Sequence, residues 1–322
     1  MDSITGLPVA LAAAKAASPH GYQSTGFSAC CNRYGLVSLA SRLLMVCYDT
    51  YLLKAPKKFM FVYPEIDPIL FQIGFIKIRW YGLMYVIGFL MAWWLARRRC
   101  QRADSPVNQA QVDDLIFYGM LGVIIGGRVG YCLVYGWDEL IKDPLYLVRI
   151  TEGGMSFHGG LAGVMIAMWW YGRKLGKTIW HILDFVAPIV PIGLGAGRVG
   201  NFINGELWGS ETSVAWGVLY QGVVRHPSQL YEAALEGLAL FVILWWYSAK
   251  PRPYMAVSAL FLLLYGVFRF FVEFYRVPDA HLGHLALDWV TMGQILSAPM
   301  IIAGAVMLVM AYAQDRKKEA AA

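Results

Sequence analysis

The chain has 322 residues, of which 58% are apolar and only 15% are charged. Soluble domains carry roughly 25% charged residues, so this composition and the mean hydropathy of +0.50 indicate an integral membrane protein. The basic residues that give the formal net charge of +6 lie between apolar stretches. We therefore do not interpret this charge as a nucleic-acid-binding surface.

Residues 1–59 differ from the rest of the chain. Their apolar part, residues 36–53, is interrupted by Arg42 and Asp49 and makes a poor spanning helix. No clean signal-peptide cleavage site follows it, and Met60 opens a stretch that resembles a natural start. We expect residues 1–59 to be a disordered or wrongly assigned N-terminal extension, and residues 60–322 to form the membrane domain.

Seven apolar stretches follow Met60. They cover about residues 80–96, 114–134, 157–172, 182–197, 229–247, 256–273 and 293–312. Some are shorter than the roughly 20 residues of a straight span, so the third and fourth are expected to be broken or re-entrant. The sequence therefore predicts an all-α polytopic membrane protein with about seven transmembrane helices.

The loops after the first, third, fifth and seventh stretches are rich in Lys and Arg. They carry Arg97, Arg98, Arg99 and Arg102, then Arg173, Lys174 and Lys177, then Lys250 and Arg252, and finally Arg316, Lys317 and Lys318. Cytoplasmic loops carry such an excess, so we expect these loops and the C-terminus inside and Met60 outside. Segments 135–156, 198–228 and 274–292 would then form an outer head.

The segment from Gly195 to Gly209 is the most polar stretch beside an apolar one. It holds Arg198, Asn201, Asn204 and Glu206 among glycines, and such groups beside hydrocarbon indicate a site. Glycines let the backbone approach a ligand, and the arginine fork suits a phosphate. The alternative is that Arg198 only reaches to the interface and that the glycines are helix-packing positions.

Two further segments carry candidate groups. His158 opens the third stretch between glycine pairs, where it is either a general base or a structural hydrogen-bonding group. Tyr265, Arg269, Glu273 and Arg276 recur at steps of three and four residues, so they share one helical face. Arg269 either pairs only with Glu273 or faces the same cavity as Arg198.

Three groups are plausible neighbours of these residues. Arg128 is a costly charge within the second stretch. Residues 226–232 (HPSQLYE) enter the fifth stretch, where Pro and Ser suit a helix start, so much of this motif is expected to be structural. Tyr81 lies at the start of the first stretch, where it belongs to an interfacial aromatic belt or reaches the cavity.

Several chemistries are excluded by the absence of their motifs. The chain has no Walker loop, no dinucleotide fingerprint, no zinc spacing and no Gly-x-Ser-x-Gly elbow. We therefore expect no cofactor and no metal. From the residues alone the chain is a membrane protein with an outward-facing site for an anionic lipid. A channel or transporter, another phospholipid head-group transferase and a structural scaffold remain alternatives.

Seven motifs resemble those of the bacterial prolipoprotein diacylglyceryl transferases. They are YPEIDP (63–68), WYGLM (80–84), GGRVGY (126–131), GMSFHGG (154–160), GRVGNFINGELWG (197–209), HPSQLYE (226–232) and YGVFR (265–269). The resemblance runs from Met60 to about Ala313 and leaves residues 1–59 unmatched. It implies seven transmembrane helices with a periplasmic head, in the bacterial inner membrane.

The resemblance also implies a reaction. The diacylglyceryl group of phosphatidylglycerol moves to the lipobox cysteine of a prolipoprotein, a thioether forms and glycerol 1-phosphate leaves. Arg198 and Arg269 match the family's essential arginines, and His158 matches its important histidine. The other matching positions, expected to bind phosphatidylglycerol, are Asn201, Tyr81, Tyr265, Gly209, Glu206 and Glu273.

These matches give a hypothesis for the mechanism. The two arginines would hold the phosphate, whose negative charge grows as it leaves. His158 would remove the thiol proton, or would only orient lipid while the arginines lower the pKa of the thiol. The expected partners are phosphatidylglycerol, a prolipoprotein and membrane lipids, with no nucleic acid.

Overall fold

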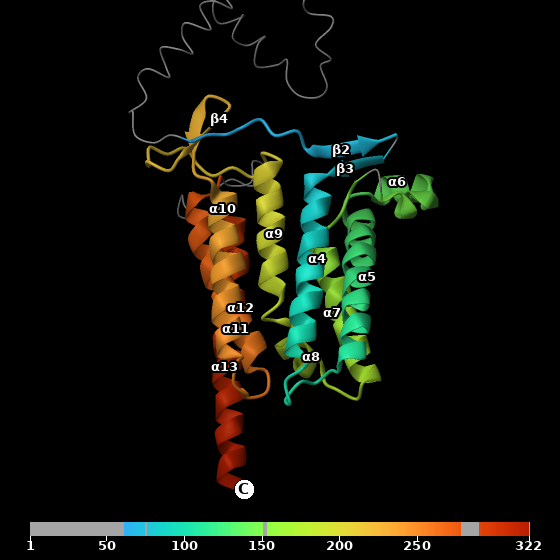
Figure 1. Cartoon of the computed structure of the whole chain (residues 1–322), viewed down its shortest axis with the longest axis vertical. Coiled ribbons are helices and arrows are strands. Elements are labelled where there is room, and N and C mark those ends of the chain that lie inside the picture. The colour runs from blue at the N-terminus through green and yellow to red at the C-terminus, as the bar shows by residue number, and fades with distance from the viewer. Residues whose placement is uncertain (1–60, 75, 151–152, 278–289, 322) are drawn as a thin grey trace, which may run out of the picture. The chain divides into compact units, whose positions relative to one another are not determined.

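The computed structural model describes residues 61–74, 76–150, 153–277 and 290–321. The predicted N-terminal extension lies outside these residues and stays a prediction. The described chain consists mainly of long helices that run alongside one another (Figure 1). These are α4 (Trp80–Arg99), α5 (Gln109–Val134), α7 (Phe157–Lys174), α8 (Ile179–Val186), α9 (Val190–Ile203), α10 (Ser228–Glu232), the π-helical η4 (Ala233–Ala239), α11 (Leu240–Tyr247), α12 (Ala256–Val272) and α13 (Met292–Ala321).

Short elements lie at one end of these helices (Figure 1). Strands β1 (Phe61–Val62), β4 (Val218–Tyr220) and β5 (Val223–Arg225) form one sheet, in which β4 pairs parallel with β1 and antiparallel with β5. Strands β2 (Ile69–Ile73) and β3 (Ile76–Arg79) form a hairpin that leads into α4. The remaining short helices are α6 (Trp137–Lys142), η2 (Pro144–Val148) and η5 (Glu273–Tyr275).

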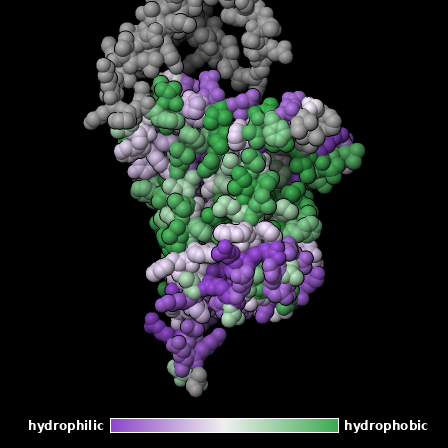
Figure 2. Space-filling model, in the orientation of Figure 1, coloured by the Kyte–Doolittle hydropathy of each residue, from purple (hydrophilic) through white to green (hydrophobic). Residues whose placement is uncertain are grey.

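The described residues show a multi-pass membrane protein. Each of the seven predicted stretches coincides with a helical segment. Four helices are long and apolar enough to cross a membrane, and a fifth crossing results if the bent pair of α8 and α9 is one span. Helices α4 and α7 do not meet that standard, since both are rich in Trp and Tyr and carry cations in their last turn. An apolar belt separates two more polar ends (Figure 2).

The fourth stretch is broken, as expected. Helices α8 and α9 meet at an angle of 53°. The expectation of a broken third stretch is wrong, because α7 runs unbroken along α5. Glycines of both helices make this close packing possible: a methyl group on Gly122 would lie 2.7 Å from the Gly163 carbonyl oxygen. The glycines there serve helix contact and require no break.

One apolar cluster fixes the helices on the side of α4, α5 and α8. It contains Leu95, Val112, Leu115, Ile182 and Phe185, all 5% exposed or less. Where these helices lie in a bilayer, such side chains stabilise the structure by close van der Waals packing and not by removal from water.

A second, aromatic cluster holds the segment that follows α9. The Tyr63 hydroxyl donates to the carbonyls of Phe202 and Ile203, at 2.9 and 2.7 Å. Its ring meets Trp208 and Tyr220 edge-on. The strand sheet is thereby fastened to the C-terminal end of α9, where the polar segment begins.

Candidate functional site

Six charged side chains from α9, α10, η4, α12 and the segment that follows α12 meet near the strand-bearing end of the helices. We call this group the arginine–glutamate cluster, and its members are Arg198, Arg269, Arg276, Glu232, Glu236 and Glu273. Arg198 comes from α9, Glu232 and Glu236 from α10 and η4, and Arg269 from α12. The prediction that Arg198 and Arg269 face the same place is confirmed by their shared carboxylate partner.

Glu232 is the centre of the cluster. Its carboxylate oxygens lie 2.7 Å from Arg198 Nε, 2.8 Å from Arg269 Nη1 and 2.6 Å from Arg276 Nη1. The Glu232 side chain is only 1% exposed. A buried carboxylate is stable only when it is paired, and here three guanidinium groups share that task.

Glu273 closes the cluster on the side of α12. Its Oε2 lies 2.9 Å from Arg269 Nη2 and 3.3 Å from Arg276 Nε, and its Oε1 accepts a hydrogen bond from Thr291 Oγ1 at 3.0 Å. The interpretation that Arg269 pairs only with Glu273 is therefore wrong. Arg269 pairs with Glu273 along its own helix, and it also reaches across to the partner of Arg198.

Glu236 is held differently from the other two carboxylates. Its side chain is fully buried, yet its nearest cations, Arg198 Nη2 and Arg269 Nη1, are 3.8 and 3.9 Å away. Within the described residues neither of its carboxylate oxygens accepts a hydrogen bond. Nearly all buried polar groups are hydrogen-bonded, so this carboxylate is the least satisfied of the three.

Glycine contacts and a helix irregularity create this geometry. A methyl group on Gly195 of α9 would lie 3.1 Å from the Gly237 Cα of η4, so the two backbones approach closely. One turn further along α9, Arg198 therefore reaches Glu232. The π-helical turns of η4 follow Glu232 directly, and such turns frequently occur at functional sites. The alternative that Arg198 is only an interfacial residue is wrong, although Gly195 is indeed a packing position.

Asn201, Glu206 and Tyr81 lie around the end of α9. Asn201 is buried three residues after Arg198, and its carbonyl accepts from the Glu206 amide at 2.9 Å. The Glu206 side chain is exposed, and its Oε1 accepts from Asn204 Nδ2 at 3.4 Å. Tyr81 packs against Gly200 of α9 and interacts electrostatically with Arg198 and Glu206. Of these three side chains, Tyr81 is the one that interacts directly with a member of the cluster.

Gly209 acts through the backbone. A methyl group at this position would lie 2.5 Å from the Tyr275 carbonyl oxygen and 2.6 Å from that of His226. The Gly209 amide donates to the His226 carbonyl at 2.9 Å, and Gly209 pairs as an isolated bridge with Arg276. The absence of a side chain thus positions the backbone that carries Arg276.

Tyr265 lies one helical turn before Arg269. Its ring stacks on Phe261 with centroids 5.9 Å apart, and it interacts electrostatically with Glu236 and Arg269. It therefore lies on the Glu236 side of the cluster.

Two predicted residues do not join the cluster. His158 begins α7, its side chain is exposed, and its ring meets Phe157 edge-on. Arg128, expected as a neighbour of Arg198, donates instead to backbone carbonyls, including those of Leu147 at 3.2 Å and Gly154 at 3.1 Å. The reason is the packing: α5 and α7 lie along each other, whereas α9 lies along α4 and η4.

The sequence interpretation missed Glu236, and it included Glu232 only as the last residue of a neighbouring motif that was expected to be largely structural. Residues 226–232 are largely structural, as expected: Ser228 Oγ donates to the Leu207 carbonyl at 2.9 Å, and Gln229 donates to the Glu206 carbonyl. Glu232, the last residue of this motif, is the exception. Two glutamates four residues apart in an apolar stretch were a signal, because an intramembrane charge requires a partner.

One group outside the spans has a shifted acidity. Burial lowers the pKa of His226, whose Nδ1 lies 3.0 Å from the Tyr231 hydroxyl. Among the described residues, no three His, Cys, Asp or Glu side chains are placed to hold a metal ion. The site therefore offers guanidinium and carboxylate chemistry, suited to an anionic group that enters between paired charges.

Comparison with known proteins gives one consistent result. A family model described as prolipoprotein diacylglyceryl transferase matches residues 68–310. The phosphatidylglycerol--prolipoprotein diacylglyceryl transferase of Oleidesulfovibrio alaskensis is 57% identical over 265 residues, which cover 81% of this chain and 98% of the relative. Proteins of the same name from Ectopseudomonas mendocina and Pseudomonas aeruginosa PAO1 are each 54% identical over 266 residues, 81% and 82% of this chain and 100% of each relative.

Proposed function

The chain belongs to the prolipoprotein diacylglyceryl transferase family, and we propose that the arginine–glutamate cluster is where it handles phosphatidylglycerol. It is a membrane transferase of lipoprotein biosynthesis. The donor is phosphatidylglycerol and the acceptor is a prolipoprotein, at the thiol of the lipobox cysteine.

The reaction is a displacement at a saturated carbon. The thiol sulfur attacks the glyceryl carbon that bears the phosphate, a C–S bond forms and the C–O bond to the phosphate breaks. Glycerol 1-phosphate leaves with the bonding electron pair, and the thiol proton passes to a base. The leaving phosphate gains negative charge, so fixed cations beside it lower the barrier.

The observation that carries this assignment is the sharing of Glu232 by Arg198 and Arg269. Two guanidinium groups from distant parts of the sequence are held at one point. Arg198 uses only Nε for its close contact, and its side chain keeps 23% exposure, the largest of the three arginines. Its Nη edge makes only the longer 3.8 Å ion pair with Glu236, so it can donate to phosphate oxygens, and Arg269 stabilises the same anion from α12.

The bordering residues would position the lipid. Asn201 and Glu206 follow Arg198 in the chain, and Tyr81 of α4 and Tyr265 of α12 interact electrostatically with the arginines. The backbone at Gly209 pairs with Arg276. Glu273 keeps Arg269 and Arg276 in place.

The thiol proton has two candidate acceptors. His158, which the sequence indicates, would act on a thiol that reaches the start of α7. Glu236, whose carboxylate lacks hydrogen bonds among the described residues, would act within the cluster. Comparison of His158→Gln with Glu236→Gln assigns the role. The variant that loses turnover but still binds phosphatidylglycerol identifies the base, and normal turnover in His158→Gln would remove the histidine from the mechanism.

The finer membrane arrangement is also proposed here. Seven spans, an outer head at the cluster end and a cytoplasmic C-terminus in the inner membrane agree with the basic loops. Labelling with a membrane-impermeant maleimide tests this arrangement in intact spheroplasts that carry single cysteines at Lys142 or Lys317. Labelling of Lys142→Cys alone supports it, and labelling of Lys317→Cys alone would reverse it.

The activity test uses purified protein in detergent, phosphatidylglycerol and a synthetic lipobox peptide. Mass spectrometry should detect a diacylglyceryl adduct that is lost with a Cys→Ser peptide and with Arg198→Ala enzyme. Arg173→Ala is the matched control, since Arg173 lies at the opposite end of α7 from His158 and outside the cluster. Arg198-dependent lipid binding without any adduct would favour a lipid-transporting protein instead.

A further inference from the structure

The other end of the helix bundle contains a second polar pocket. It has a volume of about 230 Å³ and lies between the end of α4 with the loop that follows it, helix α8, and the turn that joins α11 to α12. Helix α4 has 20 residues, so its two ends are about 30 Å apart. Tyr81 marks the cluster at one end of α4, and Arg99 lines the pocket at the other.

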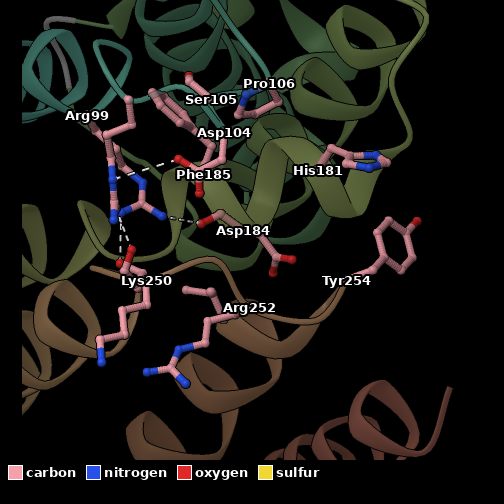
Figure 3. Close-up of a pocket in the computed structure, with 13 residues that line it drawn as sticks. Arg99, Asp104, Ser105, Pro106, His181, Asp184, Phe185, Lys250, Arg252 and Tyr254 are labelled. Carbon is pink, nitrogen blue, oxygen red and sulfur yellow. Dashed lines mark hydrogen bonds and ion pairs between the residues drawn. The ribbon is translucent and has the colours of Figure 1, made fainter. Parts of the chain in front are cut away.

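The pocket carries an excess of positive charge. Its lining includes four cations, Arg99, Arg102, Lys250 and Arg252, and two carboxylates, Asp104 and Asp184. Lys250 and Arg252 extend on one side of the pocket, whereas His181 and Tyr254 lie on the other (Figure 3).

One of the two carboxylates is already committed. Asp184 accepts from the Met255 amide at 2.7 Å, the Ser258 amide at 2.8 Å and Ser258 Oγ at 2.6 Å. It therefore caps the start of α12, and its charge is satisfied by those donors. The cations of the pocket are not neutralised by Asp184 through any ion pair within the described residues.

Arg99 and Arg102 donate to neutral groups, and Arg102 Nε also lies 3.8 Å from Asp104 Oδ1. Arg99 Nη1 donates to Ser248 Oγ at 2.8 Å, and Arg102 donates to the carbonyls of Ser248 and Ala249. Arg99 Nε is buried without a hydrogen-bond partner in the described chain. Lys250 is exposed and forms no ion pair there. Arg99 and Lys250, which form no ion pair in the described chain, therefore keep their charge available for an anion.

The position of the pocket relative to the membrane surface indicates the source of such an anion. Near it, at the ends of α4 and α7, four cations lie over tryptophan rings: Arg97 over Trp93, Arg98 over Trp94, Arg173 over Trp169 and Lys174 over Trp170. Tryptophans beside cations mark the head-group level of a bilayer. The pocket is smaller than the ~300–1,000 Å³ of sites for drug-sized ligands and fits a head group.

We propose that this pocket binds the phosphate of an anionic phospholipid from the leaflet opposite the arginine–glutamate cluster. Arg252 and Lys250 approach the phosphate from the α11–α12 turn, and Arg99 approaches it from α4. The bound lipid ties these elements together at the end of the molecule away from the chemistry, so its loss weakens the fold without stopping transfer.

The test measures lipid binding in the Arg198→Ala background, which weakens lipid binding at the cluster. Detergent-purified protein is titrated with dioleoylphosphatidylglycerol, dioleoylphosphatidylcholine or inorganic phosphate and followed by native mass spectrometry. Lys250→Glu should weaken phosphatidylglycerol binding about tenfold, the loss of one charged contact. Lys317→Glu, an equal charge change on the C-terminal tail, should leave it unchanged.

Each other outcome overturns the proposal in a distinct way. Equal binding by Lys250→Glu and Lys317→Glu would exclude the pocket as the site. Equal binding of phosphatidylcholine would exclude an anionic specificity. Complete competition by inorganic phosphate at the same concentration would identify a site for free phosphate instead of lipid. Transfer activity of Lys250→Glu with Arg198 intact is measured separately, so a failure here does not bear on the transferase assignment.

Discussion

Two sites in this molecule stabilise buried guanidinium charges in different ways. Arg128 is 1% exposed and donates to carbonyls of residues 146, 147, 153 and 154. The arginine–glutamate cluster instead pairs three guanidiniums with three carboxylates. Backbone carbonyls cannot leave, whereas a carboxylate can share its cation with another anion. Arg128 therefore fixes the fold, and the cluster can exchange partners.

This contrast shows why an intramembrane arginine alone does not identify a site. Arg128 and Arg198 look equally costly in the sequence, and both lie among glycines. The distinction comes from what surrounds them after folding. Arginine-to-lysine substitutions keep the positive charge but reduce the number of hydrogen-bond donors. They can therefore distinguish an arginine that fixes the fold from one that binds a ligand.

The largest effect is expected from loss of the central carboxylate. Glu232→Gln leaves three arginines without their shared partner and should destabilise the protein by about 3–5 kcal/mol. Glu236→Gln, whose cations are 3.8 and 3.9 Å away, should cost about 1 kcal/mol. Thermal unfolding in detergent measures both, and equal losses would contradict the central position of Glu232.

The second-largest effect is expected from Arg198→Lys, and it should appear as a lower rate of transfer. The ammonium retains a charge for Glu232 but cannot also offer a planar pair of donors to phosphate. Transfer to the lipobox peptide should fall roughly 100- to 1000-fold, while the melting temperature stays close to that of the parent. Near-normal turnover would show that the guanidinium fork of Arg198 is not used.

Arg128→Lys should give the reverse pattern. One ammonium cannot replace a guanidinium that donates to four carbonyls, so stability should fall by about 2–3 kcal/mol. Turnover for each folded molecule should be retained. A loss of turnover without a loss of stability would place Arg128 in the chemistry and remove the contrast with Arg198.

A smaller effect is expected at Gly209. Gly209→Ala must displace the carbonyls of Tyr275 and His226 and should cost about 1–3 kcal/mol. It should also lower activity, since it moves Arg276. Gly197→Ala on α9 is the matched control. It meets no atom within 4 Å and should stabilise the helix by about 0.5–1 kcal/mol. The same loss in both variants would refute the backbone role of Gly209.

The smallest effect concerns pH. Burial lowers the pKa of His226 in the folded protein, so the unfolded chain takes up the proton more readily, with a pKa of about 6.5. Stability should therefore be constant above that pH and fall as the pH drops below it. His226→Gln should show a smaller decrease in melting temperature between pH 7.5 and pH 5.5, and an unchanged decrease would rule out this contribution.

Much of the fold could be predicted, because apolar stretches report membrane helices directly. The bend between α8 and α9 followed from their shortness, whereas the unbroken α7 did not, since glycines that pack helices resemble glycines that break them. In the site, the spacing of residues 265–276 placed Arg269 correctly. Glu232 was hidden in a motif that looks like a helix start. His158 lies away from Arg198 because α7 packs along α5, whereas α9 packs along α4 and η4. The sequence does not show which helices become neighbours.

The π-helical stretch η4 has a consequence for any change of length in this region. Each π turn contains an extra residue relative to an α-helix, so the faces of α10 and α11 are offset from those of one regular helix. Deletion of a single residue between 233 and 239 would allow α10, η4 and α11 to form one regular α-helix. It would rotate α11 relative to α10 by about 100°. The side chains of Leu240 and Leu244, now in contact with α12, would turn away while Glu232 stayed in place. The number of residues between 233 and 239 therefore sets the angle between the face of α10 that carries Glu232 and the face of α11 that packs on α12.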